Sequence, residues 1–312
     1  MIQVFHSVAA ARTALGSCAI TIGKYDGMHL GHQKILQELK VEALRLDVPT
    51  LVILSEPQPE EFFAGPAAPA RLNAFHDKVR FLDQFGIDAV YCLGFDRETS
   101  AQLPDVFVSE VLQQGLGMRS IVVGDDFRFG YNRSGDISTL QRLAAAGNFT
   151  VKPVAPCVES GERISSTLIR RYLQQGDCEH ANACLGRAYS ISGKVIEGRK
   201  LGRQLGFPTA NLQLANNKLP LMGIFVVEVL HGGTTYQGVA SVGYNPTVSD
   251  ASQASLEVYL LDFVGDLYGS ILTASFLHKL RDEAKFASLE LLQQQIAADV
   301  KDARTYFGVS SK

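Results

Sequence analysis

The sequence predicts a parallel α/β fold followed by an all-β fold that ends in a helix. Three observations support this prediction. In the first half, short runs of β-forming residues alternate with helical patterns, which is typical of a parallel α/β sheet. In the second half, short β-rich runs follow one another with glycines between them, which favours a closed or nearly closed antiparallel barrel. The last periodic segment, 289–307, indicates an amphipathic helix laid against that barrel.

The elements of the first half are expected in a regular order. They are a strand at 19–22, a helix from His32, a strand at 50–54, a helix around 77–85, a strand at 89–92, a helix around 105–112 and a strand at 120–123. Parallel sheets bind ligands beyond the carboxyl ends of their strands. Polar residues that directly follow these strands are therefore the first candidates for a functional site.

The pattern changes near Arg187. The expected strands beyond it are 189–195, 224–230, 236–242, 256–263 and 270–277, and helix returns only after Phe286. We therefore place the domain boundary near Leu185, which gives domains 1–184 and 185–312.

Composition excludes several classes of protein. A chain of 312 residues with 46% hydrophobic residues is long and apolar enough for two globular domains. Its net charge of -3 gives no general attraction to nucleic acid or to an anionic membrane, and no apolar stretch is long enough to span a bilayer. We expect no nucleic-acid or membrane partner, and a monomer or weak homo-oligomer.

The cysteines and the N-terminus indicate a compartment. Five cysteines without CxxC spacing fit reduced thiols better than a disulfide framework or a zinc knuckle. The segment from Val8 to Ile22 is interpreted as helix then strand, because Arg12 interrupts it and no basic leader precedes it. A cytoplasmic location is expected.

The most informative segment places two histidines, His29 and His32, directly after the first predicted buried strand. They fall in the first turn of a helix, where free backbone N–H groups and the positive helix end attract phosphate. Residues three apart share a helix face, so both imidazoles can reach one anion. Gly31 between them permits close approach of a nucleotide. The alternatives are two unrelated surface histidines or a metal pair, although zinc pairs on helices usually use HExxH spacing.

Two more segments follow the same logic. Asp125, Asp126 and Phe127 leave a strand end together, a composition suited to gripping a flat ring system and organising a cation. A polar loop with core phenylalanines is the alternative.

The second segment, ISSTLIR, indicates a hydroxyl-rich helix start. Arg170 lies on the same face as Ser166 and Thr167, so this helix end is expected to bind the far phosphates of ATP. For Ser165 or Ser166 alone, helix capping is the alternative.

The sequence motifs of the chain carry two resemblances. The pattern GxxDGxHxGH at 23–32 resembles the signature of the nucleotidyltransferase superfamily, whose members transfer a nucleotidyl group from ATP or CTP. Nearly the whole chain resembles the bifunctional riboflavin kinase/FMN adenylyltransferases of bacteria, also called FAD synthetases. The motifs that carry this likeness are GKYDGMHLGH, EPQP, VGDDFRFG and ISSTLIR, followed by GRAYSISGKV, LGFPTAN, GYNPT, LEVYLLDF, DLYG and LRDEAKF.

The second resemblance implies a fold and two activities. It implies an N-terminal Rossmann-like adenylyltransferase domain and a C-terminal six-stranded barrel that acts as a flavokinase. The barrel would phosphorylate riboflavin to FMN, and the first domain would adenylylate FMN to FAD and release pyrophosphate. ATP is then the co-substrate of both reactions, riboflavin, FMN and FAD are substrates or products, and Mg²⁺ is the expected metal.

The resemblance also implies a role for individual residues. The expected catalytic residues are His29, His32, Arg170 and Glu257; the nucleotide-binding residues are Gly23, Asp26, Gly31, Ser165, Ser166, Thr167, Gly206 and Pro208; the flavin-binding residues are Asp125, Asp126, Phe127 and Arg281; and the metal ligands are Thr209 and Asn211.

Chemistry gives the kinase residues a reason. Riboflavin offers a neutral alcohol, so a base such as Glu257 is useful. The hydroxyl and amide oxygens of Thr209 and Asn211 are hard ligands suited to magnesium. A turn with an Asx hydrogen bond is the alternative for the latter pair, and an ion pair with a cation such as Arg281 is the alternative for Glu257.

The pair Lys24-Tyr25, Ser55 and Leu168 depart from the family pattern without removing an expected catalytic residue. Two rival functions are weighed against this family. A class I tRNA synthetase would need a KMSKS-like loop and a basic tRNA surface, and neither is evident. A non-catalytic flavin-binding protein would not need His29, His32, Arg170 and Glu257 together.

Overall fold

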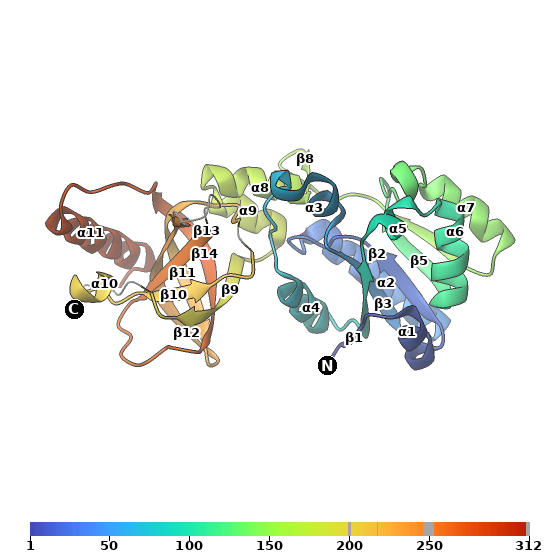
Figure 1. Ribbon diagram of the computed structural model, residues 1–312, viewed down its shortest axis with the longest axis horizontal. Coiled ribbons are helices and arrows are strands. Elements are labelled where there is room, and N and C mark those ends of the chain that lie inside the picture. Colours follow the sequence, from blue (N-terminus) through green and yellow to red (C-terminus); the bar gives the residue numbers. More distant parts are fainter. Residues whose placement is uncertain (199–200, 217, 246–252, 310–312) are drawn as a thin grey trace. The chain divides into compact units, whose positions relative to one another are not determined.

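The computed structural model describes residues 1–198, 201–216, 218–245 and 253–309. The chain forms two compact units (Figure 1). The first consists of Met1–Pro69 and Phe75–Ile164, and the second of Ala70–Ala74 and Ser165–Lys312.

Over its described residues, the first unit is built on a parallel sheet of six strands in the order β1-β4-β3-β2-β5-β6. The strands are β1 (Gln3–Phe5), β2 (Cys18–Ile22), β3 (Thr50–Glu56), β4 (Ala89–Gly94), β5 (Met118–Gly124) and β6 (Thr150–Val154). The predicted strands of this half are confirmed. The edge strands β1 and β6 were not expected from the pattern, because each is short and only partly buried.

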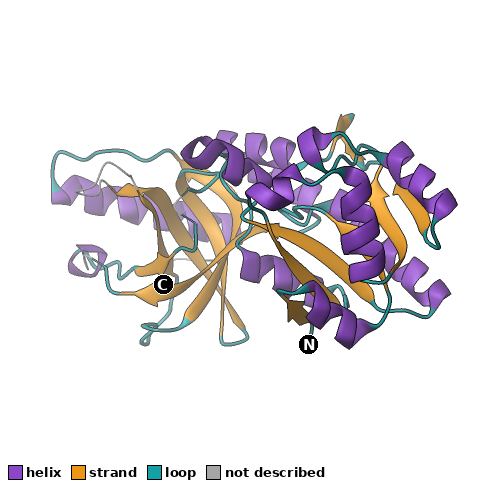
Figure 2. Cartoon of the chain, turned by 45° about the vertical axis from the view of Figure 1, so that its right-hand side comes forward, coloured by secondary structure: helices purple, strands orange, loops and turns teal. Residues whose placement is uncertain are grey.

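Helices cover both faces of this sheet (Figure 2). Alternate strand residues point to opposite faces, so Ile20 packs with Leu112 and Leu140 on one side, and Ala19 packs with Leu36 and Leu82 on the other. The helical segments of the first unit are α1 (Val8–Leu15), α2 (Leu30–Leu46), α3 (Pro59–Ala64), η1 (Gly65–Ala67), α4 (Phe75–Gln84), α5 (Arg97–Ala101), α6 (Pro104–Val106), the π-helical η2 (Phe107–Gly115), η3 (Tyr131–Arg133) and α7 (Ile137–Ala146).

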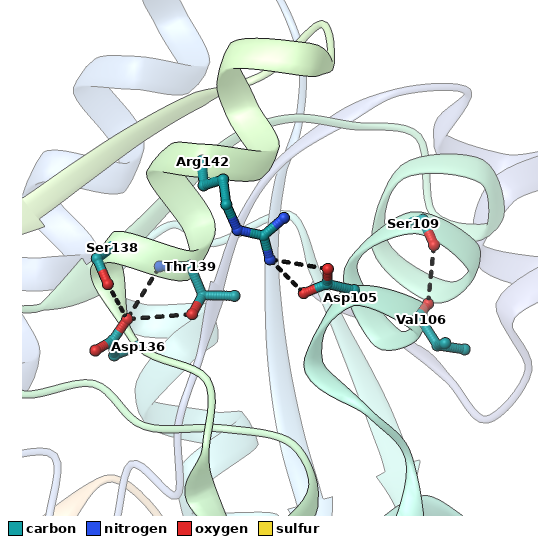
Figure 3. Close-up of polar contacts among 7 residues, drawn as sticks. All are labelled: Asp105, Val106, Ser109, Asp136, Ser138, Thr139 and Arg142. Atoms are coloured by element: carbon teal, nitrogen blue, oxygen red, sulfur yellow. Dashed lines mark hydrogen bonds and ion pairs between the residues drawn. The ribbon is translucent and has the colours of Figure 1, made fainter.

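Local polar contacts fix the start of α7 (Figure 3). Asp136 is its N-cap and accepts hydrogen bonds from the Thr139 backbone N–H at 3.0 Å and the Ser138 hydroxyl at 2.6 Å. Arg142, one turn further, donates to both carboxylate oxygens of Asp105 on α6 at 2.7 and 2.8 Å. This pair is exposed, so it orients the two helices more than it stabilises them.

The strand order reverses at β2, which lies between β3 and β5. Ligands of open parallel sheets bind beyond the carboxyl ends of the strands at such a reversal. The chain leaves β2 toward His29 and leaves β5 toward Asp125, so the topology carries both segments to this position.

The second unit contains a closed antiparallel barrel, six-stranded over the residues described, in the order β10-β13-β12-β11-β14-β9. Its strands are β9 (Tyr189–Ile196), β10 (Ala210–Gln213), β11 (Gly223–His231), β12 (Thr234–Asn245), β13 (Gln253–Leu260) and β14 (Ile271–Arg281). The fold class is confirmed in both halves. β10 is the strand that periodicity alone did not reveal, because it has four residues and follows the Gly206–Pro208 turn.

Helices flank this barrel. They are α8 (Ser166–Gln175), α9 (Cys178–Leu185), α10 (Leu201–Gln204) and α11 (Leu289–Phe307), and a small hairpin of β7 (Val158–Glu159) and β8 (Glu162–Arg163) precedes them at the end of the first unit. As expected, α11 lies against the barrel (Figure 1), where Ala303 packs with Ile224 and Val226. Because alternate residues such as Phe225 point the other way, toward Phe276, β11 is buried on both faces.

Candidate functional site

The turn between β2 and α2 is held in an uncommon backbone conformation. Tyr25 and Met28 have φ of 47° and 48°, in the left-handed region that residues with a side chain rarely adopt. The buried Tyr25 ring fixes the turn, because its hydroxyl lies 2.7 Å from the Thr21 hydroxyl on β2. Strained backbone of this kind is found where a structure must aim particular groups. Here the groups that follow are the two histidines.

His29 and His32 form a stacked pair at the start of α2. Their ring centroids are 3.6 Å apart with an interplanar angle of 18°, and Tyr25 lies 4.8 Å from the His32 ring. His29 is the N-cap of the helix and is only 7% exposed. Its Nδ1 accepts the His32 backbone N–H at 3.3 Å, which leaves the proton of the neutral ring on Nε2. Among the described residues, the buried Nδ1 of His32 has no hydrogen-bond partner.

Both imidazoles are held neutral. Burial, and then the positive charge of Arg163, lower the pKa of His29 to about 4. Burial also holds the pKa of His32 well below its usual value, with further lowering from His29, Lys78 and Lys24. At neutral pH the pair can therefore donate hydrogen bonds to an anion without first becoming charged. Gly31 keeps the pair in place, because a Cβ there would lie 3.1 Å from the His29 ring.

Two ion pairs that the sequence analysis missed surround this turn. Lys24 pairs with Glu60 of α3, and both side chains are partly exposed. Lys78 of α4 lies 3.7 Å, Nζ to Oε1, from Glu56 at the end of β3, and it is completely buried. The EPQP motif signals Glu56, but the only signal of Lys78 is an ionisable residue on the apolar face of a helix.

Asp125 and Asp126 lie beyond the end of β5 and are exposed. Arg163 of β8 contacts both carboxylates, at 3.5 Å and 2.6 Å respectively. Phe127 is partly buried and stacks on Phe129 at 5.3 Å. The acids are thus accessible to a ligand, whereas the two phenylalanine rings pack into the unit.

The segment that holds Ser165, Ser166, Thr167 and Arg170 belongs to the second compact unit. Ser165 caps α8, because its hydroxyl accepts the Leu168 backbone N–H at 3.1 Å, so the capping interpretation is observed for this serine. Arg170 donates from Nε to the Ala70 carbonyl at 2.6 Å. Thr167 is exposed in the first turn.

An exposed aromatic cluster also escaped the sequence analysis. Phe62 and Phe63 of α3 and Phe95 after β4 contact one another edge to face, with centroids 5.1 to 5.9 Å apart. The Phe63 side chain is 70% exposed. Phe95 is fixed to the sheet by its N–H, which donates to the Glu56 carbonyl at 3.0 Å.

In the second unit, polar residues of three neighbouring strands face one cavity. Asn211 of β10 and Ser241 of β12 both lie opposite Glu257 of β13 in the strand register. The Thr209 hydroxyl donates to Glu257 Oε2 at 3.1 Å. Thr209, Asn211 and Glu257 therefore form one group of oxygen donors.

Glycines give this group its space. A Cβ on Gly198 would lie 2.3 Å from the Asn211 side chain, and one on Gly202 would lie 3.3 Å from the Thr209 hydroxyl. Gly206, with φ of 88°, makes the turn before Pro208 that returns the chain to β10. The arrangement explains why this glycine-rich segment surrounds Thr209 and Asn211.

The cavity itself has a volume of about 470 Å³ and lies between the barrel wall and α11. Its apolar lining includes Val239, Leu292 and Ile296, and Arg281 closes one side. Arg281 does not pair with Glu257: its Nε and Nη2 each donate to the Asp299 carboxylate at 2.7 Å. Asp299 is 4% exposed, and the sequence analysis missed it because α11 was interpreted only as a packing helix.

The donor set fits the expected metal. No group of three or more His, Cys, Asp or Glu arranged to hold a metal occurs in the described part of the chain. The hydroxyl of Thr209 and the amide oxygen of Asn211, beside the Glu257 carboxylate, are instead hard ligands of the kind that Mg²⁺ accepts alongside water and phosphate.

Comparison with known proteins matches each half of the chain to a family model. A family model described as FAD synthetase matches residues 11–168, and one described as riboflavin kinase matches residues 185–307. A bifunctional riboflavin kinase/FMN adenylyltransferase of Pseudomonas fluorescens is 45% identical over 97% of each chain. A protein of the same description from Escherichia coli K12 is 41% identical over 99% of this chain and 98% of its own.

A solved structure also matches nearly the whole chain. A protein of Streptococcus pneumoniae described as a macrolide-efflux protein has a TM-score of 0.83 and 28% identity, over 97% of this chain and 99% of its own. That description belongs to the other protein. Over the residues described here, no helix has the length and apolar character that crossing a membrane requires.

The relatives decide between the three functions that the sequence left open. The relatives are similar to this chain through both units, and this chain matches both family models. Neither a tRNA synthetase nor a non-catalytic flavin-binding protein would explain these two findings. The chain belongs to the bifunctional riboflavin kinase/FMN adenylyltransferase family, and it phosphorylates riboflavin to FMN and adenylylates FMN to FAD.

Proposed function

We propose that the two reactions use two separate sets of residues, one around the histidine pair and one around Glu257. The supporting observation is that each unit gathers its own polar group at one position: the stacked histidines after β2, and Glu257 with Thr209 and Asn211 on the barrel wall. The two sets suit different chemistry, because one reaction begins from an alcohol and the other from a phosphate.

For riboflavin phosphorylation, Glu257 accepts the proton of the riboflavin hydroxyl. The alcohol is neutral, so a positioned base helps it attack the terminal phosphate of ATP. Thr209 and Asn211 would hold Mg²⁺, which supplies charge neutralisation to the ATP phosphates when it is bound. Gly206 and Pro208 shape the loop beside the nucleotide, and Arg281, held by Asp299, borders the flavin.

For FMN adenylylation, no base is required because the FMN phosphate is largely ionised at neutral pH. The requirement is to stabilise charge as pyrophosphate leaves. Neutral His29 and His32 donate hydrogen bonds at the positive start of α2, where Gly23, Asp26 and Gly31 shape the approach. Ser165, Ser166, Thr167 and Arg170 are assigned to the ATP phosphates on the strength of the family motif.

The flavin of this second reaction is assigned to the side of β5. Asp125 and Asp126 are exposed and adjacent to Phe127, which suits an aromatic ring system with polar edges. The exposed rings of Phe62 and Phe63, together with the partly buried ring of Phe95, offer further stacking surface.

The remaining assignments concern the chain as a whole. We place the boundary between the two activities at residues 184 and 185, which the spans of the two family models support. We also propose a cytoplasmic monomer or weak homo-oligomer with no nucleic-acid partner, on the basis of five cysteines without CxxC spacing and the slightly negative charge.

The test uses the full-length protein with riboflavin, ATP and magnesium, and separates the flavins by chromatography. His32→Ala should lower FAD formation by roughly a hundredfold to a thousandfold, because one charge-stabilising contact is removed. FMN should still accumulate at the wild-type rate. Equal loss of FMN and FAD, in a protein with unchanged circular dichroism, would contradict separate residue sets.

A further inference from the structure

A buried lysine lies beside the adenylylation residues. The Lys78 side chain has no exposed area, and its ammonium lies 3.7 Å from Glu56, whose side chain is 19% exposed. Burying an ammonium group is costly, and a buried ion pair stabilises a fold little compared with apolar residues of similar size. Packing alone therefore does not explain a lysine here.

The position of Lys78 relates it to His32. Glu56 ends β3, the strand that pairs with β2, and the chain passes from β2 into the histidine turn. The charges of Lys78, Lys24 and His29 act on His32. Glu56 pairs with Lys78, Glu60 pairs with Lys24, and the rings of His29 and Tyr25 contact the His32 ring.

Burial, then His29, and then Lys78 and Lys24 lower the pKa of His32, so both ammonium charges act in the same direction. Solvent screens the charges of the two lysines to different extents. The Lys24 side chain is 41% exposed, so water and salt screen its charge. Lys78 is screened by neither, because it is enclosed by protein.

We propose that Lys78, held by Glu56, is a positioning residue for FMN adenylylation. Its buried charge adds to the effect of burial on the His32 ring and helps to hold that ring as an uncharged hydrogen-bond donor. This inference rests on the proposed role of His32 and assigns no contact between Lys78 and a substrate.

The chain provides a matched control. Lys152 lies 3.7 Å from Glu38, the same distance as in the pair of Lys78 and Glu56. In this second pair, however, the side chains of both residues are open to solvent. Lys152→Met removes a lysine charge from the same unit without touching the site. It should leave FMN adenylylation unchanged.

The experiment measures kcat and KM for FAD formation from supplied FMN and ATP in full-length Lys78→Met. We expect kcat to fall roughly tenfold, less than for a direct contact, because the lysine acts through His32. The acidic limb of the pH profile should move to higher pH, since His32 becomes easier to protonate once the cation is gone. Riboflavin phosphorylation should be unaffected.

A double mutant separates this inference from the proposed function. If Lys78 acts through His32, adding Lys78→Met to His32→Ala should change the rate less than about twofold. An unchanged kcat and pH profile in folded Lys78→Met would overturn the inference and leave the role of His32 intact. Full activity of His32→Ala would overturn both. Lys78→Gln replaces Lys78→Met should the latter not fold, and failure of both to fold would assign Lys78 a structural role and overturn the inference.

Discussion

At the scale of single residues, the two reactions differ in what they need from a side chain. In the proposed mechanism Glu257 accepts a proton from a neutral alcohol, whereas His29 and His32 meet a phosphate that is already ionised. The structure is consistent with this difference. Glu257 accepts a hydrogen bond from Thr209, as a carboxylate does, and the histidines are stacked and buried, which favours their uncharged form.

Glu257→Gln tests the proton acceptor. The change preserves shape but removes basicity, so FMN formation should fall by roughly a hundredfold to ten-thousandfold. FAD formation from supplied FMN should continue. Arg281 pairs with Asp299 instead of Glu257, so Gln at this position breaks no ion pair among the described residues. A kinase rate close to wild type in folded protein would remove Glu257 from the mechanism.

The depressed pKa of His29 predicts how stability depends on pH. The unfolded chain protonates this histidine near pH 6.5, but the folded protein does so only near pH 4. Between these values the unfolded state binds more protons, so the free energy of unfolding decreases as pH falls from 6.5 to 4. The stability that depends on an uncharged His29 is therefore fully present above pH 6.5 and is lost below pH 4.

His29→Asn isolates this effect, because asparagine can still cap α2 but does not titrate. Urea unfolding at pH 7 and pH 4.5 should show that wild-type protein loses roughly 2–3 kcal/mol more than the variant does. Parallel losses in the two proteins would mean that His29 is not the group responsible.

At the scale of elements, the start of α2 combines a helix end with a tightly packed glycine. Gly31→Ala should favour the helix, since alanine has about 1 kcal/mol better helix propensity than glycine. However, its Cβ would lie 3.1 Å from the His29 ring and displace it. We therefore expect FAD formation to decrease roughly tenfold without loss of stability.

The control for this change is Gly94→Ala, also in the first unit. A Cβ at Gly94 meets no atom within 4 Å, so the substitution should leave FAD formation unchanged. The measurements for both variants are thermal melts and the rate of FAD formation from supplied FMN. If Gly31→Ala retains the wild-type rate, the histidine ring tolerates displacement and its geometry is not critical.

The elements also show what a sequence pattern can and cannot predict. Long periodic or β-rich segments such as α2 and β11 were predictable, because burial dictates their composition. The spacing of the motif placed His29 and His32 on one helix face, and their rings do stack. Glu257 was expected from the family resemblance. Lys78 and Asp299 could not be predicted as site neighbours, because each is defined by a partner from a distant segment.

At the scale of the whole molecule, the boundary between activities and the boundary between compact units differ. The kinase family model begins at residue 185, but the long segment of the second compact unit begins at Ser165 and includes α8 and α9. α9 is part of the barrel's packing. Ala181 and Cys184 are fully buried, and Asn182 donates to the Phe276 carbonyl at 2.9 Å and accepts the Tyr189 N–H at 2.7 Å.

Two fragments, one beginning at Ser165 and one at Leu185, separate these boundaries. Both should phosphorylate riboflavin, because Thr209, Asn211, Glu257 and the cavity lie beyond residue 185. The shorter fragment loses the Asn182 hydrogen bonds and the apolar contacts of α9, so its Tm should be lower by about 5 °C or more. Thermal melts followed by circular dichroism, with FMN formation at a temperature where both are folded, give the two readouts. Equal melting temperatures would show that α9 adds nothing to the barrel, and a folded but inactive longer fragment would show that the kinase needs residues before Ser165.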